Sequence, residues 1–133
     1  MPPSPTKEQI DELLAFLPAL EAPGRSFRED RGLEPQPDGS LTFPWVDYAP
    51  DVVAFFRCAS QPWFADVAYP TKNPGAWLKN PDFIQTASME QLITLLTYCN
   101  RGERFNAGHW RYVLENGIIQ RILRRMAALS AGI

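Results

Sequence analysis

Residues 88–129 read SMEQLITLLTYCNRGERFNAGHWRYVLENGIIQRILRRMAAL, and this stretch decides the fold. It contains no proline, so it is free to be helical almost throughout. Ser88 and Gln91 have the spacing of a capping box, which predicts a helix start. A second helix is expected from about Asn106 to Glu115, ending at Gly117. The first and the last of three predicted helices each carry an apolar stripe, formed by Met89, Leu92, Ile93, Leu96 and Cys99 and by Ile118, Ile119, Ile122, Leu123, Met126 and Leu129.

The ten residues RGERFNAGHW, from Arg101 to Trp110, join the first two of these helices. A helix leaves carbonyl groups unpaired at its end and N–H groups unpaired at its start. A carboxylate can accept from the N–H groups and a guanidinium can donate to the carbonyls. We therefore expect Glu103 and Arg104 to brace the two helix ends.

The remaining residues of this junction support the same interpretation. Phe105 precedes the expected cap Asn106 and could pack back onto the helix as a hydrophobic staple. Gly108 removes a side chain where the helices would otherwise collide. The junction is thus predicted to be structural, although a polar site is the competing hypothesis.

One alternative makes the junction an active site. His109 is the only histidine, so an imidazole base would have to be this residue. A small enzyme would need Glu103, Arg104 and His109 to converge in one pocket. No nucleophile elbow or other catalytic signature accompanies them, so they are weak catalytic candidates and we assign no catalytic residue.

A second alternative is nucleic-acid binding. Residues 1–100 carry seven basic and thirteen acidic side chains, whereas residues 101–133 carry six arginines and two glutamates. The first two predicted helices could form a helix-turn-helix with His109 and Arg111 pointing outward, but the turn is longer than usual. A pI near 5.4 is also unlike that of a typical DNA-binding domain. The six arginines of this hypothesis are Arg101, Arg104, Arg111, Arg121, Arg124 and Arg125. The candidate binding residues of the junction are Arg101, Arg104, His109, Trp110 and Arg111.

The first 81 residues hold all thirteen prolines and must consist of short elements joined by turns. Thr6 and Gln9 form another capping-box pattern, which predicts a helix that ends or kinks at Pro18. Pro50 suits the first position of a further helix. Residues 25–48 are the least determined, and they leave room for one short hairpin or an ordered loop.

Large aromatic residues punctuate the segment from 63 to 83. Such side chains could line a ligand groove or stack on sugars or bases. More often they anchor an irregular segment to a helical core, which is the interpretation we favour. The aromatic residues are Trp63, Phe64, Tyr69, Trp77 and Phe83.

Composition narrows the class further. With 133 residues, 45% hydrophobic and 21% charged, the chain suits one globular domain. No apolar run is long enough for a membrane span, and the N-terminus does not read as a secretory signal. Cys58 and Cys99 are too few and too far apart for a zinc site or a disulfide framework, so we expect two buried thiols in a reducing cytoplasm. No phosphate-binding glycine loop is present, and we assign no cofactor and no metal.

The runs MEQLITLLTYCNRGERF and GHWRYVLENGIIQRILRRM resemble the C-terminal half of a family of small bacterial proteins known only as a domain of unknown function. The resemblance covers about residues 8–128, with ERF and the downstream glycine and aromatic as its most recognisable part. It implies a compact cytoplasmic domain and supplies no activity.

The expected fold is mainly α: one domain over residues 1–133, with four to five helices and an irregular aromatic-rich and proline-rich middle. Residues 1–5 are expected to be a disordered tail, and 82–133 a contiguous helical half. The leading functional hypothesis is a non-enzymatic interaction or scaffold module that associates with itself through an exposed apolar helix face. The wide stripes on the helix from Pro50 and on the last helix motivate that hypothesis.

Overall fold

The computed structural model describes residues 5–25, 27, 48–80, 82–104, 106 and 108–131. The described part is helical and contains no strand, which confirms the mainly α class. It has more helices than the four or five expected, because turns divide the chain into short pieces. The tail before residue 5 and the hairpin considered for 25–48 fall largely outside the described residues.

The N-terminal region folds into three of these helices. The capping box of Thr6 and Gln9 is present and begins α1 (Lys7–Leu14). Pro18 does not simply end this helix, because it lies in the first turn of a separate short helix, α2 (Leu17–Leu20). A proline is tolerated there, since first-turn N–H groups have no partner within the helix. α3 (Pro50–Ala59) starts at Pro50, as predicted.

The middle segment is less irregular than its prolines suggested. It forms short helical turns, each with a proline in or just before its first turn: η1 (Pro62–Phe64), α4 (Tyr69–Lys72) and α5 (Pro74–Trp77). A further turn, α6 (Phe83–Thr86), follows. Phe64 is fully buried, and Trp77 stacks on Phe83 with ring centroids 5.0 Å apart. The aromatic side chains therefore anchor these turns to the core, as we favoured.

The C-terminal region consists of α7 (Met89–Arg101), η2 (Gly102–Arg104), α8 (His109–Glu115) and α9 (Ile118–Ser130). The capping box of Ser88 and Gln91 begins α7, and Gly117 ends α8 with a positive φ of 72°; both features were predicted. α8 starts at His109, three residues later than expected.

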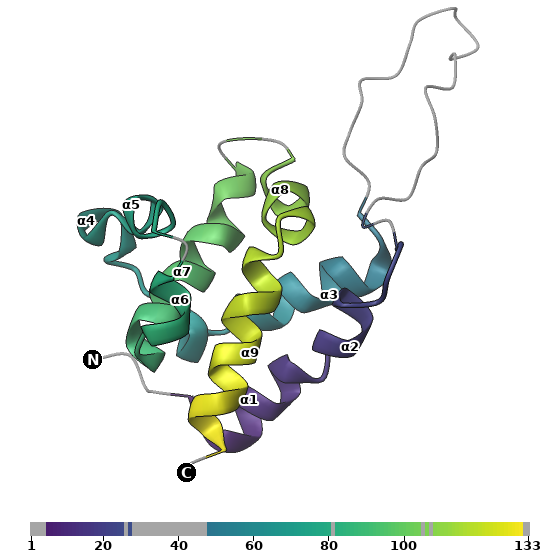
Figure 1. Cartoon of the computed structure of the whole chain (residues 1–133), viewed down its shortest axis with the longest axis horizontal. Coiled ribbons are helices and arrows are strands. Elements are labelled where there is room, and N and C mark those ends of the chain that lie inside the picture. The colour runs from purple at the N-terminus through teal and green to yellow at the C-terminus, as the bar shows by residue number, and fades with distance from the viewer. Residues whose placement is uncertain are drawn as a thin grey trace, which may run out of the picture.

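The last helix organises the packing. Figure 1 shows α9 running through the middle of the molecule, with α3 crossing behind it. α9 contacts α1, α2, α6, α7 and α8, while α3 packs on α1 and α7, and α4 and α5 pack on α7. The apolar stripe of α9 is consequently in the core rather than on the surface. Each fully buried large apolar side chain stabilises the fold by about 1.5–3 kcal/mol.

This burial removes the basis for self-association through an apolar helix face. On α3, Val52, Phe55 and Phe56 are at most 1% exposed, and the stripe of α9 is buried except for Leu129, which is partly buried against the core. Among the described residues, the large hydrophobic side chains that remain exposed are the separate Val67 and Tyr112. Two such residues on different elements do not make an apolar docking face.

Candidate functional site

Glu103 closes the junction between α7 and α8. Its carboxylate accepts hydrogen bonds from the backbone N–H groups of Gly108, at 2.8 and 3.0 Å, and of Trp110, at 3.2 Å. It also accepts from the hydroxyl of Tyr48 at 2.6 Å. The predicted capping role of Glu103 is confirmed. Tyr48 is a partner that the sequence did not reveal, because 55 residues separate it from Glu103.

The end of α7 is braced differently from our expectation. The indole N–H of Trp110 donates to the Asn100 carbonyl at 2.8 Å, and the Asn106 N–H donates to the Gly102 carbonyl at 2.9 Å. Arg104 is exposed and makes no hydrogen bond or ion pair with the part of the chain that is described. The predicted bracing role of Arg104 is therefore wrong. The Asn100 carbonyl at the end of α7 is bound by the indole N–H of Trp110 from α8, so it does not need the guanidinium of Arg104 as a donor.

The sequence predicts that Gly102 ends a helix and that Gly108 relieves a collision. Gly102 does cap α7, but the reasons why glycine is needed at the two positions differ from those predicted. A Cβ on Gly108 would meet nothing within 4 Å, so this glycine does not relieve a collision. It is needed for its backbone, since its φ of 92° is rarely adopted by other residues. The close approach occurs at Gly102, where a Cβ would lie 2.3 Å from Cδ2 of His109.

The predicted cap at Asn106 is also wrong, because Gly108 is the residue that precedes α8. Asn106 still contributes through its backbone carbonyl, which accepts from the His109 N–H at 3.0 Å. The side-chain acceptor that a cap supplies comes from Glu103 instead. The staple proposed for Phe105 lies outside the described residues.

His109 is packed into the junction and does not point outward. Its ring meets Tyr98 edge-on, with centroids 5.5 Å apart, and lies over the backbone of Gly102. Nε2 is buried and has no hydrogen-bond partner among the described residues. Burial lowers the pKa of His109 below the ordinary 6.5, although the nearby charge of Glu103 opposes this effect.

A cleft of about 540 Å³ opens between α3, η1 and the α7–η2 segment. Three arginines line it: Arg57 from the last turn of α3, Arg101 from the end of α7 and Arg104 from η2. None of them has a carboxylate partner among the described residues. Arg57 was missed from the sequence because it lies 44 residues before Arg101, in a helix whose pattern indicated only core packing.

The uncharged polar side chains that line this cleft, and its one acidic side chain, have hydrogen-bond partners within the protein. The Asn100 side-chain amide donates to the Phe56 carbonyl at 3.2 Å and to the Ser60 hydroxyl at 2.8 Å. That hydroxyl in turn donates to the Phe56 carbonyl at 2.7 Å. Glu103 is the acidic residue of the lining, and it is bound by Tyr48 and the α8 backbone.

The aromatic side chains beside the cleft also pack against one another. Trp110 stacks on Phe56 with centroids 4.2 Å apart and an angle of 6° between the rings. Tyr48 packs against the same indole at 5.2 Å. With neighbours on it from two elements, the Trp110 ring is built into the wall and is not a free surface on which a base or a sugar could stack.

The five binding residues predicted from the sequence therefore fall into two groups, inside and outside the cleft lining. Arg101, Arg104 and Trp110 line the cleft, whereas His109 and Arg111 do not. Arg111 lies on the exposed face of α8 and donates to Glu115 at 2.7 Å. Of the proposed catalytic group, Glu103 and Arg104 line this cleft, whereas His109 is absent from its lining.

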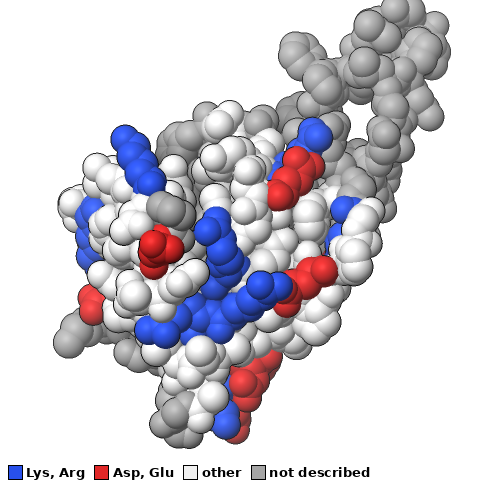
Figure 2. Space-filling model, viewed as in Figure 1, with Lys and Arg blue, Asp and Glu red and all other residues white. Residues whose placement is uncertain are grey.

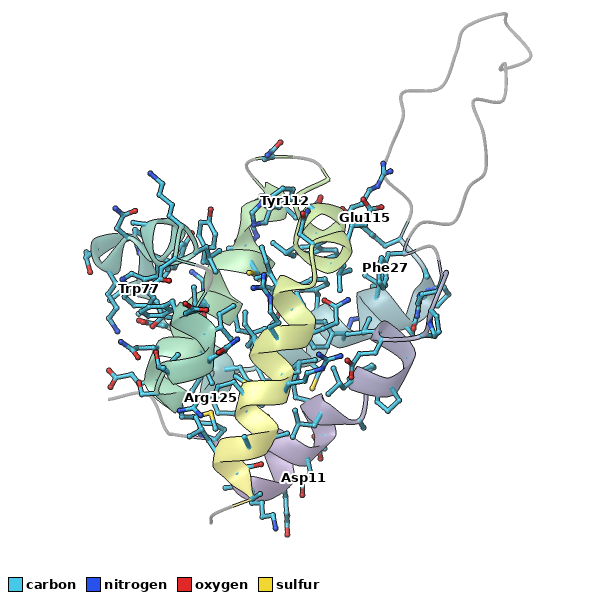
Figure 3. All side chains as sticks on the ribbon, viewed as in Figure 1. Asp11, Phe27, Trp77, Tyr112, Glu115 and Arg125 are labelled. Atoms are coloured by element: carbon cyan, nitrogen blue, oxygen red, sulfur yellow. The ribbon has the colours of Figure 1, made fainter. Side chains whose placement is uncertain are left out.

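The other arginines lie on α9. Figure 2 shows basic side chains gathered over this helix, with an acidic residue at one end of the group. Arg124 is paired with Glu21 of α2. Arg125, on the α6 side of α9 in Figure 3, donates to the Ala87 carbonyl at 3.0 Å. Arg121 donates to the Gly117 carbonyl at 3.3 Å. These side chains are separate from Arg101 and Arg104 of the cleft.

Metal sites and membrane-spanning helices are two further features that bear on function. Within the described ranges, no three His, Cys, Asp or Glu side chains gather as metal ligands would. In the same part of the chain, no helix is both long and apolar enough to cross a membrane.

Comparison with known proteins gives a family. Residues 5–132 match the model of a family of unknown function (DUF6508). Because the match covers nearly the whole sequence, the chain belongs to this family, and the resemblance to a domain of unknown function is confirmed. No curated protein and no solved structure matches the chain. Family membership therefore carries no activity over to this protein.

Proposed function

We propose that this protein is a non-enzymatic interaction module whose arginine cleft accepts an acidic segment of a partner protein. One observation carries the proposal: Arg57, Arg101 and Arg104 converge on one cleft with no carboxylate partner among the described residues. Guanidinium groups bind carboxylates in a planar, two-pronged geometry. The cleft thus offers the hydrogen-bond donors of Arg57 and Arg104, which no described side chain uses, while the guanidinium of Arg101 lies over the Tyr69 ring at 5.8 Å from its centroid.

The distribution of these donors favours a protein segment over a small metabolite. Sites for small molecules usually place a few unsatisfied polar groups deep in the pocket. Here the lining residues Asn100, Ser60 and Glu103 have partners within the chain. The available donors belong to long arginine side chains, of which Arg57 and Arg104 are exposed. An anion that approaches from outside, such as a Glu or Asp side chain, suits this arrangement.

The rival functions are less well supported. An enzyme built on Glu103 and His109 would need both groups in one cavity, and His109 is absent from the lining of the arginine cleft. For nucleic-acid binding, two of the six arginines, Arg111 and Arg124, are neutralised by Glu115 and Glu21. Paired charges release few counterions from a phosphate backbone and add little affinity.

We further propose that the protein works in the cytoplasm of a bacterium. The bacterial origin is inferred from the resemblance to a family of small bacterial proteins. Two free thiols, the half-buried Cys58 and the buried Cys99, suit a reducing compartment. Burial raises the pKa of Cys99 to about 12, which makes this thiol unreactive. Fractionation of cells expressing the tagged protein tests the location, and recovery from the periplasmic fraction would contradict it.

The binding proposal is tested with a fluorescein-labelled octapeptide of glutamate, followed by fluorescence anisotropy at low salt. The wild type should bind, and the affinity should fall as salt rises. Arg57→Gln combined with Arg104→Gln should weaken binding about tenfold or more, because two charge pairs of up to about 1 kcal/mol each are lost. Arg111→Gln combined with Arg121→Gln is the matched control, since it also removes two positive charges but outside the cleft.

The alternatives give different results in the same assay. If the cleft variant and the control bind the peptide equally, binding reflects general charge and the proposed site is wrong. If a single-stranded oligonucleotide binds tightly while the peptide does not, nucleic-acid binding replaces the proposal. An octapeptide of lysine should not bind in either case.

A further inference from the structure

The ring of His109 rests on the turn that carries the cleft arginines. A Cβ on Gly102 would lie 2.3 Å from Cδ2 and 2.5 Å from Nε2 of His109, so the imidazole covers the backbone of this glycine. Gly102 directly follows Arg101 and begins η2, which also contains Arg104. The position of the imidazole and the position of the cleft arginines are therefore mechanically connected through one residue.

The surroundings of the ring suit a neutral imidazole. Nε2 is buried and has no hydrogen-bond acceptor among the described residues. Tyr98 of α7 meets the ring edge-on at 5.5 Å, and Tyr112 of α8 lies at 6.4 Å. Glu103 of η2 is the charged group that acts on His109, and its carboxylate is already bound by Tyr48, Gly108 and Trp110. The described residues around the ring thus offer no acceptor for an additional N–H.

Protonation of His109 makes this buried position unfavourable for the ring. An imidazolium carries an N–H on both ring nitrogens, and a buried N–H without an acceptor is strongly unfavourable. Tyr98 cannot relieve it by ionising, because burial raises the pKa of its hydroxyl. The ring can restore hydrogen bonding by turning toward water. It then leaves the backbone of Gly102 uncovered, and η2 loses this contact while it keeps its contacts with α7 and α8.

We propose that His109 is a pH-dependent lock on the arginine cleft: the neutral ring holds the Gly102 turn in place, and protonation releases it and weakens binding of an acidic partner. Only the second part of this inference, the weaker binding of an acidic partner, rests on the proposed function. The movement of the turn is a property of the protein alone. Burial depresses the pKa of His109, so the lock should open below about pH 6.5, the ordinary value for histidine.

The turn is tested first, without a ligand. In ¹H–¹⁵N NMR spectra recorded from pH 7.5 to pH 5, the amides of Arg101, Gly102 and Glu103 should shift with the same midpoint as the His109 ring. His109→Phe keeps a flat ring that cannot be protonated, so these shifts should vanish. His109→Gln serves the same purpose if the phenylalanine variant does not fold. Titration of the ring while the three amides stay unmoved in the wild type would overturn the lock.

Binding is tested second, with the glutamate octapeptide at pH 7.5 and pH 5.5, where most of its side chains are still ionised. Wild-type affinity should fall about tenfold between the two pH values, and the affinity of His109→Phe should stay nearly constant. Gly102→Ala should reproduce the weak binding at pH 7.5, because the new methyl group displaces the ring permanently. The φ of Gly102 is −58°, so alanine fits the backbone and circular dichroism should show an intact helical fold.

Different results would contradict the proposed acidic partner and the proposed lock by His109. If the amides shift with His109 but the peptide binds at no pH, the proposed partner is wrong and the lock stands. If the peptide binds equally at both pH values while the cleft variant loses binding, the partner stands and the coupling to His109 is wrong.

Discussion

The hydroxyl of Tyr48 donates a hydrogen bond of 2.6 Å to the carboxylate of Glu103, although 55 residues lie between them. The same hydroxyl accepts from the Arg111 N–H at 3.3 Å. Tyr48 directly precedes the segment that enters α3, so one side chain ties the start of α3 to the start of α8. Two residues that Tyr48 contacts, Glu103 and Trp110, line the arginine cleft.

The first prediction concerns Glu103. Replacement by alanine leaves the N–H groups of Gly108 and Trp110 and the hydroxyl of Tyr48 without their acceptor. A buried donor that loses its partner costs about 1–3 kcal/mol, so the free energy of unfolding should fall by that amount. Urea denaturation followed by circular dichroism measures the change.

A double-mutant cycle isolates the hydrogen bond between the two side chains. Tyr48→Phe alone should cost less than Glu103→Ala, because the carboxylate keeps its backbone donors. The two changes together should cost less than the sum of the single changes, because they remove one shared bond. Strict additivity would contradict the finding that Tyr48 and Glu103 interact.

How far the sequence predicts this structure depends on the range of each interaction. Both capping boxes, at Thr6 and Ser88, were predicted because their partners are three residues apart and need no tertiary information. The role of Gly117 followed from local rules in the same way. Three of the binding candidates, Arg101, Arg104 and Trp110, do line the cleft, since they lie close to one another in the chain.

The errors arose where distant elements meet. Tyr48 and Arg57 reach the site only because α3 packs on α7, and no local pattern announces this contact. Gly102 and Gly108 were assigned opposite reasons, because a positive φ and a close approach both favour glycine in a sequence. The middle segment looked irregular because its prolines break long helices, yet they fit well in the first turns of short ones.

The second prediction separates those two reasons at Gly108. Its φ of 92° disfavours a Cβ through the backbone, although the space around it is open. Gly108→Ala should destabilise the protein by about 1–2 kcal/mol, as expected for one residue in a left-handed conformation. Gly108→Asn should cost less, because asparagine tolerates positive φ better than alanine does. Equal loss in both variants would point to crowding instead, and thermal denaturation measures each.

The third prediction uses the ion pair between Arg25 and Asp51. The guanidinium donates to both carboxylate oxygens, at 2.5 and 3.0 Å, and this hydrogen bonding holds the pKa of Asp51 below its ordinary 3.8. The folded state thus binds the proton more weakly than the unfolded state. The stabilisation is fully present above about pH 4 and is lost as the pH falls through the folded pKa of Asp51.

The measurement is a set of unfolding free energies between pH 2 and pH 7 for the wild type and Asp51→Asn. The difference between the two proteins should be largest near neutral pH and should shrink below about pH 4. The loss should be modest, because the carboxylate is 35% exposed and water screens part of the interaction. A difference that does not change with pH would mean that packing, and not the charge of Asp51, accounts for the effect.

The fourth prediction concerns the pH dependence that His109 adds. Burial lowers its pKa, so between the folded pKa and about 6.5 the unfolded chain binds more protons than the folded protein. The free energy of unfolding should therefore decrease as the pH falls below about 6.5 and level off below the folded pKa of His109. In His109→Phe this slope should disappear, while the decrease below pH 4 from Asp51 should remain. A slope that persists in the variant would assign the effect to another group.

The last prediction tests how the end of α7 is held. The indole N–H of Trp110 donates to the Asn100 carbonyl at 2.8 Å, and its ring stacks on Phe56. Trp110→Phe keeps an aromatic ring in the stack but leaves this carbonyl without its donor, so unfolding should become easier by about 1–3 kcal/mol. Because the Asn100 carbonyl belongs to the last turn of α7, amide hydrogen exchange in this turn should accelerate more than in α9. Equal acceleration throughout the protein would show that the lost ring volume, and not the missing hydrogen bond, causes the destabilisation.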